Sequence, residues 1–230
     1  MDTSRCIWME AGAVEYQLCP LNHNCDQCDF HHEMIRGCRT GKWKLIDEFL
    51  QVPLPLQESI EFTAGLHYLD GHFWFKRKDA NHIQLGLDQL FWSLMPRVIH
   101  IVTPKENQTV AKNDCFSWIL IDGGIIYLRC PLSGTVSASN PAFQLNQSMN
   151  SALHLDVDED LWILELDIRG QEQVTALGLN KDGYLRLVQK DIGTLKKVGD
   201  VDQAGGQVRL SKSNYSNFLK GITQNRAFVC

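Results

Sequence analysis

The pattern of apolar and polar positions is clearest between residues 119 and 134. Two apolar runs rich in β-branched residues, 119–121 and 125–129, flank Asp122-Gly123-Gly124. Glycine adopts the positive φ angles that a tight hairpin turn requires, so this pattern predicts a β-hairpin. The turn cluster Pro131-Leu132-Ser133-Gly134 ends the second run, and a third strand is predicted directly after it.

Short strands dominate the middle of the chain. A second hairpin is predicted at 66–75, where Asp70-Gly71 separates two apolar runs. Further strands are predicted at 82–86, 98–102, 115–121, 125–129, 134–138 and 161–168. Apolar residues at helical spacing predict a short helix at 87–94. Many short strands with few, short helices predict a mainly β fold, either a sandwich or a small barrel.

The spacing of apolar residues changes on either side of this region. Helical spacing predicts a helix at 41–51, which Pro53 ends, and a linker at 52–59. After Gly170 the pattern predicts a hairpin at 174–189 with its turn at 180–183, a loop at 191–207, and a terminal helix at 213–222 with Ser213 as its N-cap.

These patterns divide the chain into four segments. They are a cysteine-rich module at 1–40, a helix and linker at 41–59, a β domain at 60–169, and an extension of hairpin, loop and helix at 170–230. Residues 170–207 are either an insertion in the β domain or a separate element.

Charge and hydropathy narrow the range of partners. The chain carries a formal net charge of −5, and its lysines and arginines are scattered along it. Nucleic-acid-binding surfaces gather basic residues in a patch or stripe, so no nucleic-acid partner is expected. No apolar run is long enough to span a membrane, and no signal-type segment follows the N-terminus, so the expected location is cytoplasmic.

Cysteines crowd the first 40 residues, which indicates metal binding in a chain expected to stay in a reducing compartment. Cys25 and Cys28 form a CxxC knuckle, whose short gap lets both thiolates face one ion. Cys6 and Cys19 bring the number of thiolates to four. The set predicts a structural, tetrahedral Zn²⁺ site with no open coordination position.

Other interpretations of these cysteines remain open. An iron–sulfur cluster uses the same four thiolates, although the spacing differs from the common ferredoxin runs. The thiols can also bind nothing, or Cys25 and Cys28 can act as a redox pair. Further candidate ligands are His23, His31 and His32, each of which can replace one cysteine, and Cys38, which is a spare thiol or an alternative ligand. Cys115, Cys130 and Cys230 are isolated and are expected to be buried or terminal thiols.

Several segments of the β domain, together with the terminal helix, resemble one known family. His72-Phe73-Trp74-Phe75 stands where that family has a His-Glu-Trp strand. The other matching segments follow in the family's order: 83–86, 98–110, the turn at 131–136, Asn140-Pro141, the closing strand at 161–166 and the terminal helix at 213–219. About half of the chain thus resembles the glycine cleavage H-protein, which implies a barrel-sandwich hybrid of the lipoyl/biotinyl-carrier type. The cysteine-rich N-terminus resembles an extension found in some bacterial H-protein-like proteins.

The chain departs from this family at the residue that carries its cofactor. In the H-protein, a lysine at the hairpin tip, eight residues before the proline of the turn, carries the lipoyl arm, and Gly123 occupies that position here. No lysine lies between Cys115 and Pro131, and Lys105 and Lys112 fall outside the hairpin. The resemblance therefore implies a scaffold without lipoate, unless an unexpected lysine is used.

The remaining candidates for chemistry have simpler interpretations. The acidic run at 156–160 lacks the pattern of a calcium loop and is expected to be a solvated turn. Ser133 is expected to be a turn residue, and Trp92 is either core packing or part of a partner surface. No catalytic Ser/His/Asp or Cys/His arrangement is readable.

The expected function is therefore that of a non-enzymatic interaction or regulatory subunit, which combines an H-protein-like scaffold with a Cys₄ metal site and acts with other proteins. The alternative is an electron-transfer or redox-sensing subunit that holds an iron–sulfur cluster on the same cysteines.

Overall fold

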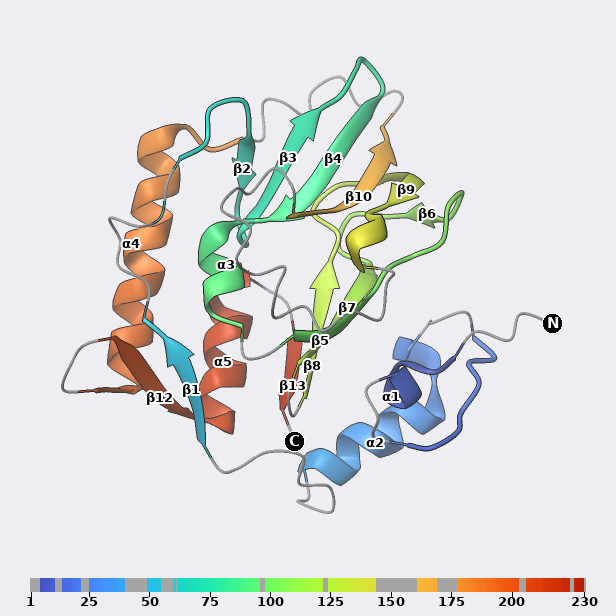
Figure 1. Cartoon of the computed structure of the whole chain (residues 1–230), viewed down its shortest axis with the longest axis horizontal. Helices are drawn as coiled ribbons and strands as arrows, with labels where there is room; N and C mark the ends of the chain where they lie inside the picture. Colours follow the sequence, from blue (N-terminus) through green and yellow to red (C-terminus); the bar gives the residue numbers. More distant parts are fainter. Residues whose placement is uncertain are drawn as a thin grey trace.

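The computed structural model describes residues 5–10, 14–21, 25–39, 49–54, 60, 62–95, 98–121, 124–143, 161–168, 178–202, 206–223 and 226–229. Within them, two antiparallel sheets share one hydrophobic core, and a third, small sheet lies beside two helices at the left of Figure 1. The N-terminal module lies at the lower right of the same view. None of the described helices is long and apolar enough to cross a membrane.

The larger sheet contains six strands in the order β2-β3-β4-β10-β9-β6. Their bounds are β2 (His67–Leu69), β3 (Phe73–Arg77), β4 (His82–Leu87), β10 (Trp162–Asp167), β9 (Gly134–Ser139) and β6 (Thr109–Val110). The predicted hairpin at 66–75 is confirmed, because β2 and β3 pair antiparallel with Leu69 opposite Phe73. The strands predicted at 82–86, 134–138 and 161–168 are confirmed as well.

The predicted helix after β4 is also confirmed. α3 (Gln89–Ser93) begins after Asp88, whose side chain accepts a hydrogen bond from the Phe91 N–H and thereby caps the helix. Trp92 on α3 is buried, and its ring lies 6.2 Å from that of Phe143 in the 3-10 helix η3 (Pro141–Phe143). Of the two interpretations of Trp92, core packing is therefore the correct one.

The second sheet contains four strands in the order β13-β8-β7-β5. Their bounds are β5 (Val98–Val102), β7 (Cys115–Ile121), β8 (Gly124–Arg129) and β13 (Arg226–Val229). The hairpin predicted from the two apolar runs within 119–134 is confirmed by the pairing of β7 with β8. Its tip, residues 122–123, lies outside the described residues.

Both faces of the β7–β8 hairpin are covered. Successive side chains of a strand point to opposite faces of its sheet. One set enters the core shared with the larger sheet: Phe116, Ile119, Ile121, Ile126 and Leu128. The other set packs against the N-terminal module: Trp118, Leu120, Ile125 and Tyr127. This second set explains why the hairpin strands are continuously apolar rather than alternating.

The N-terminal module contains two helices and a 3-10 turn that the sequence pattern did not predict. They are α1 (Ile7–Glu10), η1 (Cys25–Gln27) and α2 (Asp29–Arg39). Ile7, Trp8, Met34 and Ile35 are buried against the outer face of β7 and β8. A module of this size is too small to build its own core, so its apolar side chains use the sheet instead.

The helix predicted at 41–51 is wrong where the structure describes it. Residues 49–53 form strand β1 (Phe49–Pro53), which pairs antiparallel with β12 (Gln207–Ser211) and buries Val52 opposite Val208. Residues 41–48 lie outside the described residues. The apolar residues of 49–54 fit both the spacing of a helix and that of a strand. Pairing with β12, which is distant in the sequence, decides for the strand.

The hairpin predicted at 174–189 and the loop at 191–207 are also wrong. The polar cluster at 180–183 begins a helix, α4 (Lys181–Val198), because the Asn180 side chain accepts a hydrogen bond from the Gly183 N–H. The buried residues of α4 recur at helical spacing: Tyr184, Val188, Asp191, Ile192 and Leu195. Strand β11 (Asp200–Val201) follows and pairs with β12.

The terminal helix predicted at 213–222 is confirmed as α5 (Lys212–Thr223), but Ser213 is not its N-cap. Ser213 lies inside the helix, and the Asn214 N–H donates to the Ser211 hydroxyl at 3.1 Å instead. The predicted fold class, mainly β with short helices, is likewise confirmed by the sheets, although α4, with 18 residues, is longer than expected.

Candidate functional site

The four cysteines singled out by their spacing come together in the fold. Cys6, Cys19, Cys25 and Cys28 all line one cavity of about 390 Å³ in the N-terminal module. All four are thiols rather than disulfides. The rest of the wall is mainly apolar, with Trp8 and Phe30 among its larger side chains.

Local backbone contacts explain how residues so far apart in the module reach one cavity. An isolated bridge joins Arg5 to Leu18, and the Cys6 N–H donates to the Gln17 carbonyl at 2.9 Å, which places Cys6 and Cys19 on neighbouring segments. The CxxC knuckle is closed by the Cys28 N–H, which donates to the Cys25 carbonyl at 3.1 Å.

The protonation of these thiols depends on burial. Burial raises the pKa of Cys25, and the neighbouring thiols of Cys115, Cys19, Cys6 and Cys28 raise it further. Burial also raises the pKa of Cys6, against the opposing effect of the Trp8 and Met9 backbone N–H groups. Without a cation the thiols of Cys6 and Cys25 therefore keep their protons, and a bound metal ion would reverse that balance.

The described side chains form no ready-made metal site. No group of three or more His, Cys, Asp or Glu residues in the described part of the chain is placed to hold an ion as it stands. An ion in the cavity would require the thiols to rotate toward it and to lose their protons. Metal binding by these cysteines remains a prediction.

His31 has a structural role that competes with metal binding. The Trp8 indole N–H donates to His31 Nδ1 at 3.0 Å, and His31 Nε2 forms a hydrogen bond with the hydroxyl of Tyr127 on β8. Both ring nitrogens are thus used, which disfavours His31 as a replacement ligand. His32 is exposed on α2. The other predicted alternatives, His23 and the side chain of Cys38, lie outside the described residues, as does the acidic run at 156–160.

One thiol near this site was missed by the sequence analysis. Cys115, which the sequence pattern left isolated, packs against the cluster that contains Cys6 and Cys25. No local spacing could reveal this neighbour, because β7 reaches the module only through the packing of the sheet.

The lysines of the β domain lie away from the hairpin tip. Lys112 precedes β7, and its backbone N–H donates to the Ser133 hydroxyl at 2.9 Å, which fits the predicted turn role of Ser133. Lys105 follows β5, whose Val102 pairs with Trp118 while Val98 pairs with Ile121 near the tip. Both lysines therefore sit at the end of the hairpin opposite the tip, a separation of roughly 20 Å along a seven-residue strand. Lys112 and Arg129 also line a second cavity of about 590 Å³ at that end.

A buried charged cluster is a second feature that the sequence did not reveal. His72 Nδ1 lies 2.7 Å from an Asp88 carboxylate oxygen, and His72 Nε2 lies 3.1 Å from one of Asp191 on α4. All three residues are buried. Burial by itself would lower the pKa of His72, but the charge of Asp88 and the hydrogen bonds to both carboxylates raise it to about 9. The imidazole is therefore protonated and joins the β2–β3 turn to α3 and α4.

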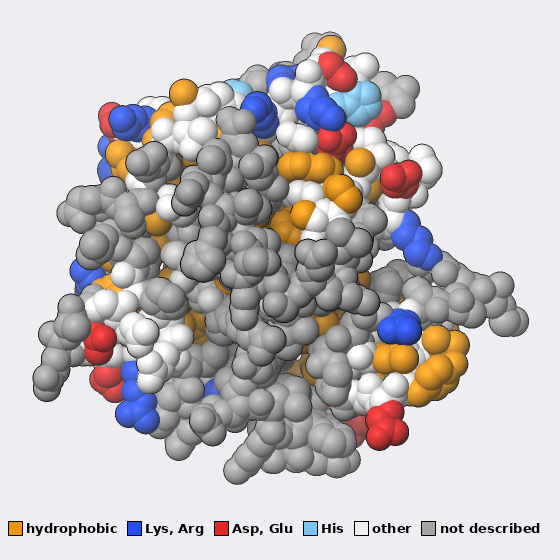
Figure 2. Space-filling model, viewed as in Figure 1, with side chains coloured by type: hydrophobic (Ala, Val, Ile, Leu, Met, Phe, Trp, Pro, Cys, Tyr) orange, Lys and Arg blue, Asp and Glu red, His pale blue; other side chains and the backbone are white. Residues whose placement is uncertain are grey.

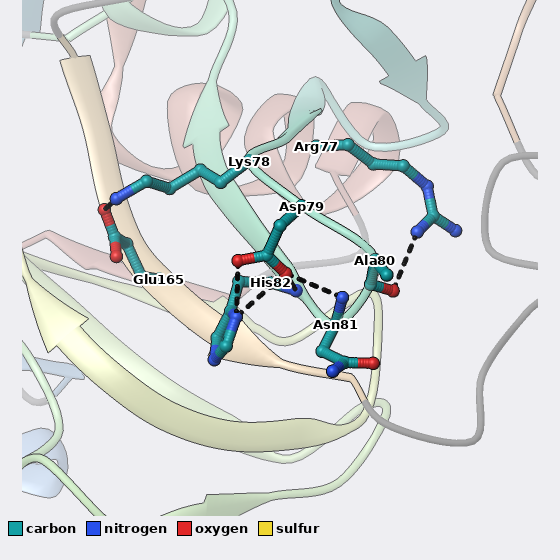
Figure 3. A network of polar contacts seen from close by, with 7 residues as sticks. All are labelled: Arg77, Lys78, Asp79, Ala80, Asn81, His82 and Glu165. Carbon is teal, nitrogen blue, oxygen red and sulfur yellow. Dashed lines mark hydrogen bonds and ion pairs between the residues drawn. The ribbon is translucent and has the colours of Figure 1, made fainter.

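The polar network at the β3–β4 turn is exposed and structural (Figure 3). The Asp79 carboxylate accepts from the backbone N–H groups of Asn81 and His82 and lies 2.9 Å from His82 Nδ1. The Asn81 N–H and the His82 side chain lower the pKa of Asp79. Lys78 forms an ion pair with Glu165 of β10 at 2.7 Å. These contacts hold the turn.

The comparisons with known proteins point to one family. No family model matches the chain. The glycine cleavage system H protein of Chlorobium phaeobacteroides is 23% identical over 118 residues, which cover 51% of this chain and 90% of that protein. The H protein of Mycobacterium leprae is 26% identical over 128 residues, which cover 54% of this chain and 94% of that protein.

A solved structure of the H protein from Mycobacterium marinum aligns with 68% of this chain and 97% of its own, with a TM-score of 0.39 and 10% identity. The predicted resemblance is confirmed by the sequence relatives, and over about half of its length this chain is H-protein-like.

Proposed function

We propose that this chain is a non-enzymatic interaction or regulatory subunit of the cytoplasm, in which an H-protein-like scaffold without lipoate carries an N-terminal module stabilised by Zn²⁺. The observation that carries the proposal is the convergence of Cys6, Cys19, Cys25 and Cys28 on one cavity. Four thiolates satisfy tetrahedral Zn²⁺ completely, so the ion stabilises the module and leaves no position for a reacting water.

The position of the lysines supports a scaffold that does not carry lipoate. A lipoyl arm needs an amine at an exposed hairpin tip, and the corresponding residue is Gly123. Lys105 and Lys112 lie at the other end of the hairpin, where an arm attached to either would start roughly 20 Å from the carrier position.

Other proteins are the proposed partners. The relatives are components of the glycine cleavage system, which supports a role beside other proteins rather than alone. Tyr16 and Leu21 of the N-terminal module are exposed hydrophobic residues. Hydrophobic side chains also gather over this module at the lower right of Figure 2, while charges of both signs are dispersed over the rest of the described surface in that view.

Elemental analysis of anaerobically purified full-length protein, combined with a visible spectrum and an intact mass, tests the proposal. We expect colourless protein with one zinc per chain and the mass of the unmodified sequence. A lipoyl-sized mass increase would overturn the scaffold part of the proposal, and protein without bound metal would overturn the zinc part.

An iron–sulfur cluster is the second candidate, which the cavity itself favours. Its volume of about 390 Å³ exceeds what a single ion needs, and its apolar wall shelters a cluster from solvent. This function predicts brown protein whose broad absorbance bleaches on reduction. Colourless protein with bound zinc rules it out.

A further inference from the structure

The larger of the two cavities described above lies where three turns of the β domain meet. The β2–β3 turn forms one wall, the turn before β7 a second, and the end of β8 with the turn after it a third. Its volume of about 590 Å³ falls within the range of roughly 300–1,000 Å³ that is typical of small-molecule sites. Strands of both large sheets contribute to it, so the cavity belongs to the folded β domain and not to the N-terminal module.

Apolar and charged side chains lie at different depths of this cavity. Phe73 and Leu132 line it and are buried. Asp70 and Lys112 are exposed, and Arg129 is partly buried. The cavity thus has an apolar floor below a charged rim, an arrangement that suits a small molecule with one apolar and one charged end.

Arg129 is held in place at the rim. One of its terminal nitrogens donates to the Asn113 carbonyl at 2.8 Å. Asn113 presents that carbonyl from a left-handed conformation, with a φ of 71°, and its own N–H donates to the Cys130 carbonyl at 2.7 Å. A guanidinium has five N–H donors in one plane and binds a carboxylate through two of them, so a single contact orients Arg129 without neutralising its charge.

Positive charge dominates the rim. Lys112 and Arg129 both line the cavity, whereas Asp70 is the one acidic side chain among the described residues of the lining. Within the part of the chain that the structure describes, no acidic side chain forms an ion pair with Lys112. The rim therefore carries a net positive charge, which favours an anionic ligand.

We propose that this cavity binds a small organic carboxylate, whose acid group pairs with Arg129 and Lys112 and whose apolar body faces Phe73 and Leu132. Arginine binds the planar carboxylate through two parallel N–H···O bonds, and the lysine adds a second positive charge. Asp70 repels the anion and limits its affinity. Binding at this site is independent of any metal in the N-terminal module.

Titration of isotope-labelled full-length protein with benzoate, followed by nuclear magnetic resonance, tests this site. Benzoate joins a carboxylate to an apolar ring, and we expect saturable shifts in the backbone signals of residues 69–73, 112–113 and 129–132. Benzamide keeps the ring without the charge and should bind at least about tenfold more weakly. Acetate keeps the charge without the ring and should also bind about tenfold more weakly.

Three results of this titration would overturn the inference. They are the absence of saturable shifts in these segments, equal binding of benzoate and benzamide, and equal binding of benzoate and acetate. All three measurements use the unchanged protein, so none depends on the folding of a variant.

Two variants and a matched control separate the cavity from general charge attraction. Lys112→Ala should weaken benzoate binding about two- to fivefold, as expected for an exposed ion pair, and Asp70→Asn should strengthen it by a similar factor. Lys105→Ala is the control and should bind benzoate normally, because Lys105 lies at the same end of the hairpin but outside the lining. Equal weakening by the two lysine variants, or no gain from Asp70→Asn, would contradict the proposed site.

Discussion

At the scale of single residues, His72 carries a buried positive charge that no pattern in the sequence predicted. In the sequence His72 is only the first residue of a strand motif, and its partners Asp88 and Asp191 are 16 and 119 residues away. The three come together because a turn, the start of α3 and the middle of α4 meet in the core. A buried imidazolium between two carboxylates is stable only while the pairing is complete.

This cluster predicts a dependence of stability on pH. The pKa of His72 is about 9 in the fold and 6.5 for an unperturbed histidine. Because the folded value is the higher one, the contribution is fully present below pH 6.5 and is lost as the pH rises through about 9. The difference between these two pKa values corresponds to roughly 3 kcal/mol of folding stability at most.

Urea denaturation of the unchanged protein and of His72→Gln at several pH values measures this contribution. The gap between their free energies of unfolding should shrink between about pH 6.5 and 9. A gap that stays constant over that range would contradict a protonated His72.

At the scale of elements, the sequence patterns correctly predicted the strands and helices that are defined by their own side chains. The hairpins β2–β3 and β7–β8 and the helix α5 follow from local turns and periodicity. β1 and α4 were predicted wrongly, for different reasons. β1 exists through pairing with β12, and the Asn180 cluster, interpreted as a turn, is the N-cap of α4. Such polar clusters favour turns and helix starts for the same reason, since their side chains bind backbone N–H groups.

Two glycines give a paired test of the β3–β4 packing. A methyl group at Gly86 on β4 would overlap the Trp74 indole ring, whose N–H donates to the Leu87 carbonyl at 2.9 Å. We expect Gly86→Ala to lower the free energy of unfolding by about 1–3 kcal/mol, because overpacking forces the ring to move.

Gly193 on α4 is the matched control for this substitution. A methyl group at Gly193 meets nothing within 4 Å, so Gly193→Ala should raise the free energy of unfolding by up to about 1 kcal/mol through helix propensity. Opposite signs in urea denaturation support the packing described here, and a neutral Gly86→Ala would contradict it.

At the scale of the whole molecule, the N-terminal module and the β domain are one packed unit. Tyr127 and Trp118 of the sheet and Trp8 of the module share a cluster, with His31 bonded to both Trp8 and Tyr127. The outer face of the hairpin that resembles a carrier hairpin is therefore covered by the chain's own N-terminus.

Removal of the Tyr127 hydroxyl should loosen this docking. Tyr127→Phe removes the buried hydrogen bond between the tyrosine hydroxyl and His31 Nε2, which should cost about 1–3 kcal/mol. We expect faster proteolysis within residues 1–40 and an unchanged rate in the β domain. Tyr16→Phe is the control, because Tyr16 is 70% exposed and should change neither rate. Equal proteolysis of the two variants would argue against the docking contact.

Loss of one ligand should affect the module more than the β domain. If Zn²⁺ binds, Cys25→Ser removes one of the four thiols that line the cavity, so the protein should lose its metal. Residues 1–40 should then become sensitive to protease, while circular dichroism still reports the sheets. Unfolding of both parts together at the same urea concentration would show instead that the metal stabilises the β domain as well.

The sequence by itself determined the hairpins β2–β3 and β7–β8, the absence of a carrier lysine from the second of them, and the group of four N-terminal cysteines, because each depends on neighbours in the chain. Only the tertiary structure decided that α4 completes a buried ion cluster, that His31 bonds a tyrosine, and that Cys115 packs against the cluster that contains Cys25. The reason is physical: a single bulge reverses which face a side chain occupies, and contacts between distant segments choose among local structures that the sequence leaves nearly equal.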